Sequence, residues 1–478
     1  MPRTQPPTEF EVLGFRRRGF SSTITPFQAA MAKYGRQAVL IGESPVSGQI
    51  YSGYTPDIYA AASAIGTGSG NSEANAMPLL SALSTVSAAG SGTVGVITGT
   101  PSAPASGGAR WTPIFRVTGS GTVGSPIRVV AKYPTTDYPD NPELWTELRS
   151  STPFAVGSSS NVAVCGVTPG VSNVQWIGFY LNQTYAPPRP SNGTVLASYN
   201  TTNVLLEKFT MDQTVNPDND NFDSFYLEDS ENTIIRNCLI RGGAGDSSVN
   251  HNASAITTYG CINFLFEHIE FVGVNGAFFI KGSNPNNSAQ LNSGIIRYNK
   301  CSVANQAFLE LANQTDGVFV YQNLGYRNRL GIWFDASGSG TIANSYVRNN
   351  TMVDNAEANY GSDTTNFGSS LDFQKNISAF TTASSAFHVN FGADDVADFS
   401  PFDDNLYHEV GGSGDFRKSS TNYSGLSAWA AAIGKEASSA ETSPGFTDSA
   451  SDNYHRTSYA DGRGCYITGS EEIGIEAA

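Results

Sequence analysis

The sequence of 478 residues has few charged side chains, few cysteines and no long apolar run. Asp, Glu, Lys and Arg make up only 14% of it, whereas glycine occurs 49 times. A glycine-rich chain with little charge favours short strands joined by tight turns over long helices. Because no apolar stretch reaches the length of a membrane-spanning helix, we expect no membrane insertion.

Positive charge is especially scarce. The sequence has 27 Lys and Arg against 42 Asp and Glu, a net charge of −15. Nucleic-acid binding needs a basic surface to meet the phosphates, so this balance disfavours nucleic acid as a partner. Neutral or cation-bridged glycans stay open as partners. The plainer interpretation is that an acidic surface keeps the protein soluble.

Cysteine is too rare and too scattered to predict a disulfide framework. The five residues are Cys165, Cys238, Cys261, Cys301 and Cys465, an odd number without metal-ligand spacing. Two of them lie beside a recurring polar position described below, so we expect buried thiols rather than disulfides. No zinc or redox site is predicted.

What the sequence does contain is a repeat. Short apolar bursts each end on a polar residue, at Asn237, His268, Asn299, Asn323, Asn350 and Asn376, with steps of 31, 31, 24, 27 and 26 residues. A period of this length, built from strands, indicates stacked coils. We predict an all-β solenoid, a parallel β-helix of nine coils from Gly178 to Asn405. At ~4.8 Å per coil it would be on the order of 40 Å long.

The recurring asparagine has a structural explanation. At a bend in each coil its amide can bond its own backbone or the asparagine of the next coil. We therefore predict an asparagine ladder at positions 237, 299, 323, 350 and 376, with no role in ligand binding.

The chain divides into three parts. Residues 1–55 are basic and form an N-terminal attachment arm or, equally, a simple cap, with a helix at 26–34 and a strand at 37–41. Residues 56–410 form the β-helix, closed at its start by a helix at 77–88. Residues 411–478 form a loop-rich C-terminal cap with a short helix at 423–434.

Three stretches resemble one superfamily. They are Gly121-Thr-Val-Gly124-Ser-Pro126-Ile127, the array of coils, and a tail with Asn405-Leu-Tyr, Trp429, Gly434 and Pro444-Gly-Phe446. Together they are similar to the right-handed parallel β-helix superfamily of polysaccharide lyases, glycoside hydrolases and phage tailspikes, over residues 58–460. The resemblance implies a right-handed single-stranded solenoid. The resemblance is specific for the fold and much less specific for activity, because this fold serves many functions.

The resemblance differs from secreted relatives at the N-terminus. Those relatives carry a signal peptide there, whereas this chain has Arg16, Arg17 and Arg18 followed by polar residues. Phage tailspikes and fibres place a virion-attachment segment at this point. The resemblance therefore implies a virion appendage, usually a homotrimer, that binds host-surface polysaccharide and contacts other virion proteins through its arm. The alternatives are a free polysaccharide lyase or glycoside hydrolase, and a non-catalytic decoration protein of a virion.

A second strand is expected in each coil after the asparagine bend. The segments are 224–228, 255–259, 277–281, 307–311, 331–335 and 386–390. If Phe225, Phe278, Ile332 and Phe387 point inward, alternation makes their neighbours point outward. The outward set is Tyr226, Glu228, Thr257, Tyr259, Phe279, Lys281, Trp333, Asp335, His388 and Asn390. The segment 307–311 breaks the alternation, so Glu310 is left facing either way.

This predicted face carries the candidate functional residues. For carbohydrate binding they are Trp333, Phe279, Tyr259, Tyr226 and Glu228, since exposed aromatic planes stack on sugars and exposed apolar groups mark binding surfaces. The alternatives are that loops or a neighbouring subunit cover this face, which would make it an oligomer interface, and that it serves neither purpose.

Catalysis on the same face would use one of two sets. Glu310 and Asp335 on successive coils could serve as the carboxyl pair of a glycoside hydrolase. Lys281 could instead be the base of a lyase, with Arg297, Arg327 or Arg329 nearby. Neither set is a known motif.

No metal site is assigned from the sequence. The acidic run Asp218, Asp220 and Asp223, followed by Glu228 and Asp229, offers the hard oxygens that calcium takes. It lacks the loop glycine of an EF-hand, so calcium is the one cofactor left open.

Overall fold

A computed structural model describes the chain from residue 50 onwards, with gaps. The described residues are 50–97, 99–103, 112–132, 146–150, 162–182, 192–213, 221–242, 254–282, 291–312, 314–335, 341–363, 367–368, 370–392, 395–411, 415–458 and 461–465. The expected helix at 26–34 and strand at 37–41 lie outside this part. Within it, no helix has the length and apolarity needed to cross a membrane.

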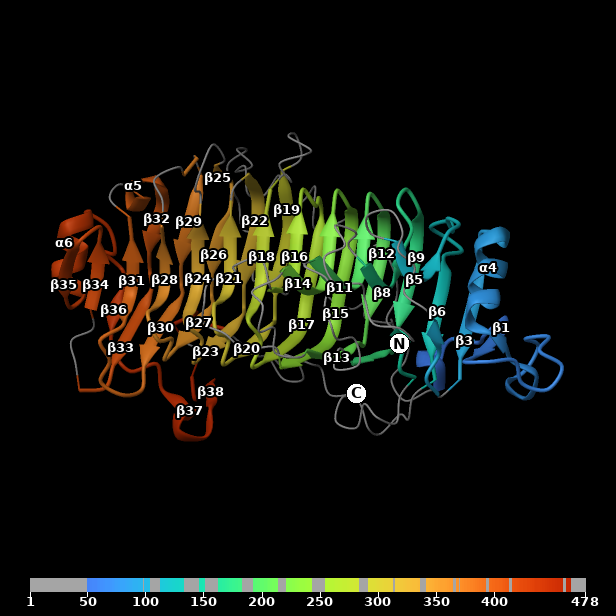
Figure 1. Cartoon of the computed structure of the whole chain (residues 1–478). Coiled ribbons are helices and arrows are strands. Elements are labelled where there is room, and N and C mark those ends of the chain that lie inside the picture. Colours follow the sequence, from blue (N-terminus) through green and yellow to red (C-terminus); the bar gives the residue numbers. More distant parts are fainter. Residues whose placement is uncertain are drawn as a thin grey trace, which may run out of the picture.

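The chain is a parallel β-helix, as the repeat predicts (Figure 1). The larger sheet has 22 strands: β1 (Ile58–Ala61), β2 (Met77–Pro78), β3 (Gly92–Val96), β6 (Ile127–Ala131), β9 (Ser172–Ile177), β10 (Tyr180–Asn182), β12 (Thr202–Glu207), β13 (Thr210–Gln213), β15 (Glu231–Gly242), β17 (Phe264–Val272), β19 (Asn292–Arg297), β20 (Lys300–Ser302), β22 (Thr315–Tyr321), β23 (Leu324–Tyr326), β25 (Ile342–Ala343), β26 (Tyr346–Arg348), β27 (Thr351–Val353), β29 (Leu371–Gln374), β30 (Ile377–Phe380), β32 (Phe399–Asp403), β33 (Leu406–Glu409) and β36 (Ala440–Glu441).

The smaller sheet has 12 strands, and this is the sheet that carries the candidate residues. It contains β5 (Thr112–Val117), β8 (Val162–Val167), β11 (Asn192–Tyr199), β14 (Asn221–Glu228), β16 (Ser254–Tyr259), β18 (Gly276–Lys281), β21 (Ala307–Ala312), β24 (Leu330–Asp335), β28 (Ala358–Ser362), β31 (Phe387–Phe391), β34 (Asp415–Lys418) and β35 (Thr421–Ser424). Its strands pair in parallel in chain order until β35, which is antiparallel. Two short pairs, β4 (Ser102–Ala103) with β7 (Arg149–Ser150) and β37 (Phe446–Asp448) with β38 (Asn453–Arg456), complete the strands.

One corner of each coil is turned by a single residue in the left-handed helical conformation. It recurs nine times with φ between 53° and 83°, at Gly178, Lys208, Asn237, His268, Tyr298, Gln322, Asn349, Lys375 and Asp404. Any residue except glycine pays about 1–2 kcal/mol for this conformation, so stacking, not local preference, imposes it at Tyr298. The nine corners match the nine predicted coils.

The residue after this corner is buried, and in five successive coils it is asparagine. Asn299, Asn323, Asn350, Asn376 and Asn405 form a ladder in which each Nδ2 donates to the next Oδ1 over 3.0, 2.9, 3.2 and 3.3 Å. Each receiving Oδ1 also accepts the backbone N–H of the preceding asparagine. The ladder thus satisfies both side-chain and backbone groups inside the solenoid.

The predicted ladder is right at four positions and wrong at Asn237. Asn237, like His268 in the next coil, occupies the left-handed corner itself. The ladder position lies one residue later and is taken in this coil by Cys238. Asn237 Nδ2 donates to Glu207 Oε1 over 3.5 Å instead. The expected buried thiols are confirmed, because Cys238 and the other four cysteines are free and buried.

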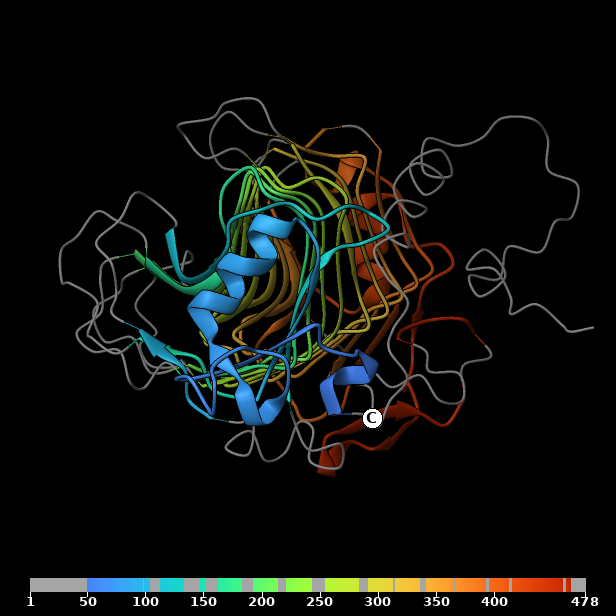
Figure 2. The ribbon, with the colours of Figure 1, turned by 90° about the vertical axis from the view of Figure 1, so that its right-hand side faces the viewer.

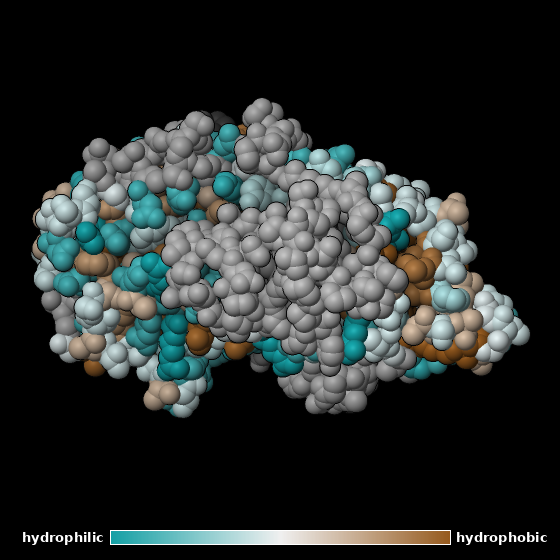
Figure 3. Space-filling model, in the orientation of Figure 1, coloured by the Kyte–Doolittle hydropathy of each residue, from teal (hydrophilic) through white to brown (hydrophobic). Residues whose placement is uncertain are grey.

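The N-terminal end of the solenoid is closed by α4 (Leu79–Ala89), close to the predicted 77–88. Leu79, Leu83 and Val86 are buried in the core, and the helix ends at Gly90 in the left-handed conformation. Viewed along the axis, α4 lies across the end of the coils (Figure 2). Apolar surface gathers at this end, where Leu80 is 48% exposed (Figure 3).

The C-terminal end is closed by α6 (Leu426–Ile433), after the short α5 (Asp395–Asp398). Trp429 of α6 is fully buried and stacks on Phe416, so the predicted helix at 423–434 is confirmed as a plug. The ladder ends beneath it: Asn405 Nδ2 donates over 3.2 Å to Glu436, whose carboxylate also accepts the Tyr407 and Ser439 hydroxyls.

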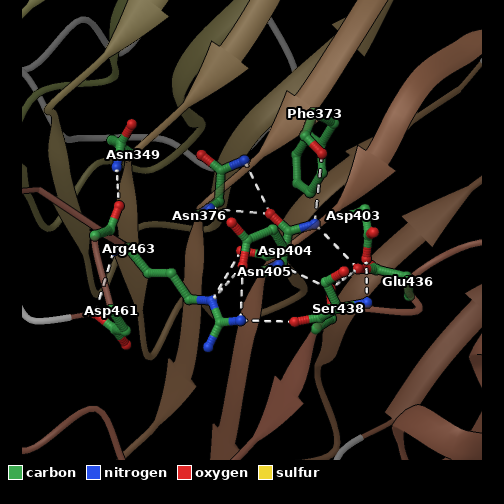
Figure 4. A network of polar contacts seen from close by, with 12 residues as sticks. Asn349, Phe373, Asn376, Asp403, Asp404, Asn405, Glu436, Ser438, Asp461 and Arg463 are labelled. Atoms are coloured by element: carbon green, nitrogen blue, oxygen red, sulfur yellow. Dashed lines mark hydrogen bonds and ion pairs between the residues drawn. The ribbon is translucent and has the colours of Figure 1, made fainter. Parts of the chain in front are cut away.

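After this cap the chain turns back along the outside of the coils. Asp452 forms an ion pair with Arg327. Arg463 bonds Asp404 and the Ser438 carbonyl (Figure 4). We call this returning segment, residues 452–458 and 461–465, the strap. Asn349 Nδ2 donates to its Gly462 carbonyl over 2.7 Å, and its Gly464 N–H donates to the Lys375 carbonyl over 2.7 Å. The predicted loop-rich cap is therefore a plug followed by a strap.

Candidate functional site

The candidate residues share one side of the 12-stranded sheet. All six predicted second strands are present, as β14, β16, β18, β21, β24 and β31, and β28 is a further one that the sequence did not predict. The inward alternation is confirmed for Phe225, Phe278 and Ile332, which lie in the core. We call the opposite side of β14 to β28 the outer face.

Strand register resolves the outer face into two columns. In the first, each residue pairs with the next: Tyr226, Thr257, Phe279, Glu310, Trp333 and Gly361. In the second, Glu228 pairs with Tyr259 and Tyr259 with Lys281, and Asp335 lies two coils further on, paired with Ala312. Glu310, which the sequence left undecided, faces outward between Phe279 and Trp333.

The two carboxyl groups proposed for hydrolysis are diagonal neighbours. Glu310 pairs with Trp333, and Asp335 lies two residues beyond Trp333 in β24. With ~4.8 Å between strands and ~3.3 Å per residue, their Cα atoms are about 8 Å apart. Side chains on Cα atoms this far apart can bring their carboxyl groups into the range of roughly 5–9.5 Å that glycosidases use.

The outer face is not the open platform that the sequence led us to expect. Phe279 is 3% exposed, Glu310 5% and Trp333 6%. The expectation that Trp333 and Phe279 are exposed is wrong, because alternation tells which side a residue faces and not whether that side is covered. Lys281, Asp335 and Tyr259, all in the second column, are half-buried and form the accessible edge.

Trp333 is held flat against the sheet. Its Nε1 donates to Asp363 Oδ2 over 3.1 Å, and a Cβ on Gly361 in the next coil would come within 2.2 Å of its ring. The absence of a side chain at Gly361 therefore leaves the space in which the indole lies. Asp363 is a member of the site that the sequence did not predict, because β28, the strand that ends just before it, was missed.

The other end of the outer face is a tyrosine–carboxylate group. The Tyr226 and Tyr259 rings are 5.5 Å apart, and the Tyr226 hydroxyl donates to Glu228 Oε2 over 3.0 Å. Burial and the neighbouring carboxylate raise the pKa of Tyr226 above its usual value. Tyr226 therefore stays neutral and acts as a hydrogen-bond donor.

Asp223 joins this group through Thr257, whose hydroxyl donates to its Oδ1 over 2.5 Å. Burial raises the pKa of Asp223 well above the usual range, which favours the protonated form of this carboxyl group. The sequence offered Asp223 only as a calcium ligand. Asp218 and Asp220 of that run lie outside the described residues, and within the described part no three His, Cys, Asp or Glu side chains gather as a metal site.

Two expectations at the C-terminal end of the sheet are wrong. His388 was expected outward, but it is buried among Phe380, Tyr407 and Phe416, with its Nδ1 2.7 Å from the Ser378 hydroxyl. Phe387 was expected inward, but it packs with Trp333 outside the core. The cause is a register shift between Phe387 and Val389. Burial lowers the pKa of His388 to about 3, so it is neutral.

The cations proposed for a lyase are not brought together. Lys281 lies on the outer face, with its Nζ 5.6 Å from the centre of the Phe279 ring. Arg297, Arg327 and Arg329 instead form ion pairs with Glu267, Asp452 and Glu357. Lys281 is thus the only one of the four on this face.

Comparison with known proteins gives structural matches alone. No protein-family model matches the sequence, and no curated protein is similar to it. Among solved structures, the chain is similar to a tailspike protein mutant of E. coli bacteriophage HK620 in complex with hexasaccharide (TM-score 0.47, 11% identity, 80% of this chain and 70% of that one). It is also similar to an exopolygalacturonase from Thermotoga maritima (0.41, 14%, 82% and 97%) and to a rhamnogalacturonan lyase (0.43, 17%, 70% and 84%).

Proposed function

We propose that this protein is a virion appendage of the phage tailspike or fibre kind, whose outer face binds host-surface polysaccharide. The observation that carries the proposal is the in-register column of Tyr226, Phe279, Glu310 and Trp333. Aromatic faces alternate in it with polar groups, which is the combination that pyranose rings bind through stacking and hydrogen bonds.

The accessible part of this surface is the second column. Tyr259, Lys281 and Asp335 are half-buried, so a glycan meets them first and reaches the aromatic side chains along that edge. The attachment role is proposed for the N-terminal arm, residues 1–55. Its test removes only residues 1–49, because Tyr51 is 5% exposed and packs on Val130 and Ile177. A homotrimer is part of the same proposal.

A second candidate function is glycoside hydrolysis, favoured by the diagonal spacing of Glu310 and Asp335. One carboxyl would protonate the glycosidic oxygen while the other removes a proton from the attacking water. Glu310 is more buried, so it is the proposed acid, and the half-exposed Asp335 is the proposed base.

Binding is tested with purified capsular and lipopolysaccharide glycans of candidate hosts. We expect Trp333→Ala and the half-buried Lys281→Ala to weaken binding at least tenfold, and Leu80→Ala, at the far end of the rod, to have no effect. Lys281→Ala keeps the test valid if the tryptophan variant unfolds. Unchanged binding in a folded Lys281→Ala and Trp333→Ala pair would refute the surface.

Attachment and catalysis have separate readouts. Deletion of residues 1–49 is expected to leave a folded rod that no longer purifies with viral particles; continued copurification would contradict the arm. Release of reducing ends, lost in Asp335→Asn, is expected for hydrolysis. An ultraviolet-absorbing unsaturated product would instead identify a lyase.

A further inference from the structure

We infer that copies of this chain associate through the N-terminal end of the rod, where α4 lies across the first coils. The inference rests on the proposed function in one respect, since it names the surface that holds the homotrimer together. Glycan binding does not depend on this contact, because the outer face belongs to a single chain.

Exposed aliphatic side chains gather at this end. Seven large hydrophobic side chains are exposed among the described residues, and three of them lie here: Ile65 (38%), Leu80 (48%) and Val123 (73%). None of the seven lies in the described part of the chain after residue 410. Apolar side chains that gather on one part of a surface mark a place of contact with another molecule.

The three side chains surround one helix. Leu80 lies on the exposed side of α4, which crosses the end of the coils (Figure 2). Ile65 lies in the segment between β1 and β2, which leads into α4. Val123 lies in the turn after Thr118, whose N–H donates to Ser87 Oγ of α4 over 3.0 Å. We call the exposed side of α4, together with Ile65 and Val123, the N-terminal end surface.

This end of the rod has very little charge. Among the described residues from 58 to 127, only Glu73 and Arg116 are charged. Glu73 forms an ion pair with Lys132 over 2.7 Å and accepts the Tyr51 hydroxyl. Arg116 donates to the Pro113 carbonyl over 3.2 Å.

The charged residues that border this stretch also bond within the chain. Asp57 Oδ2 accepts the Thr93 N–H over 2.8 Å, and Arg128 Nε donates to Gln175 Oε1 over 2.9 Å. α4 itself contains no charged residue. The N-terminal end surface therefore offers mostly aliphatic and hydroxyl groups.

A second copy is the partner that this lack of charge suits. Each copy has a net charge of −15, so two copies repel one another if they meet through acidic surface. Salt screens charges that are farther apart than ~8 Å, but it screens those inside a contact much less. Contact through an uncharged end keeps the carboxylates of two copies apart and removes the aliphatic side chains from water.

The place where the chain joins the rod fits the same contact. The first described element is η3 (Ile50–Gly53), and its Tyr51 packs on Val130 of β6, in the first coils. Because residues 1–49 precede η3 in the sequence, the arm of each copy joins the rod beside the contact. Copies associated at this end bring the starting points of their arms together, which suits attachment of one oligomer at one site.

The test measures the mass of the full-length protein in solution by sedimentation equilibrium. We expect an oligomer for the natural protein. Leu80→Glu and Val123→Glu are each expected to raise its dissociation constant by about a hundredfold or more, because the contact would bury an unpaired carboxylate. Val123→Glu changes an exposed turn and keeps the test valid if the helix variant unfolds. Val410→Glu is the matched control, since Val410 is also 48% exposed but follows β33 near the other end of the rod.

Salt gives an independent readout. Raising NaCl from about 50 to about 500 mM is expected to tighten association, because it screens the repulsion between acidic copies. Weaker association at high salt would mean that ion pairs form the contact, and would overturn the inference.

The remaining outcomes separate this contact from the proposed function. An oligomer that persists in folded Leu80→Glu and Val123→Glu, or that is lost in Val410→Glu, overturns the contact and leaves the homotrimer standing. A monomeric natural protein overturns the contact and the homotrimer together. Glycan binding by the outer face is decided by its own assay in each case.

Discussion

Glu436 should make the stability of the rod depend on pH in the range where most carboxylates have no effect. It closes the asparagine ladder with Oε2 3.2 Å from Asn405 Nδ2, and it is 3% exposed. Burial raises its pKa from 4.5 to about 7, against the opposing effect of the Ser439 and Tyr407 hydroxyls. In the unfolded chain the same carboxyl ionises near its ordinary value.

The sign follows from proton binding. Between pH 4.5 and about 7 the folded state holds the proton on Glu436 and the unfolded state does not, so the free energy of unfolding falls as pH rises. Below pH 4.5 both states are protonated and the contribution is complete, and above about 7 the loss is constant. The difference in pKa corresponds to about 3 kcal/mol.

The perturbation is Glu436→Gln, which imitates the protonated acid. At pH 5 the variant should unfold at about the same urea concentration as the natural protein, and at pH 8 it should be the more stable one by about 3 kcal/mol. Asp448→Asn, an exposed carboxylate whose side chain makes no capping hydrogen bond to the 3-10 helix that follows it, is the matched control and should leave the pH profile unchanged. Parallel pH profiles for Glu436→Gln and the natural protein would refute the reasoning.

Two further predictions concern the coils. Asn350→Ala removes a buried amide that donates to two carbonyls and to the next asparagine. We expect the free energy of unfolding in urea to fall by about 3 kcal/mol, against about 1 kcal/mol for Asn349→Ala at the neighbouring corner. Equal losses in the two variants would argue against the ladder. Gly361→Ala would press a methyl group into the Trp333 ring; we expect a loss of about 1–3 kcal/mol and altered tryptophan fluorescence, whereas Gly124→Ala, with open space around it, should be neutral.

The solenoid could be predicted because its signal repeats. A single burst such as Val-Arg-Asn-Asn350 would fit many folds, but the same burst at regular steps fits only stacked coils. It was harder to predict which residue of each burst lies at the left-handed corner and which lies in the ladder. Asparagine is favoured both in the left-handed corner and in the ladder one residue later, so the sequence alone does not distinguish Asn237 from Asn299.

The sequence could predict which side of the sheet the candidate residues face, but not whether that side is covered. Period-two alternation correctly placed Phe279 and Trp333 on one side of the sheet. It could not tell that they are buried, because alternation says nothing of what packs on that side of the sheet. β28 escaped notice since Ala358-Asn-Tyr-Gly-Ser has weak strand propensity, and its glycine is explained only by the tryptophan of the preceding coil.

The strap at residues 452–465 changes how the rod can come apart. In a plain solenoid each coil touches only its neighbours, so unfolding can begin at an end and proceed one coil at a time. Here Asp452 is tied to Arg327, and Arg463 to Asp404, two residues that lie three coils apart. The last coils are thereby crosslinked without a covalent bond, and they should open together or not at all. A protease meeting this end would find few partly opened states to cut.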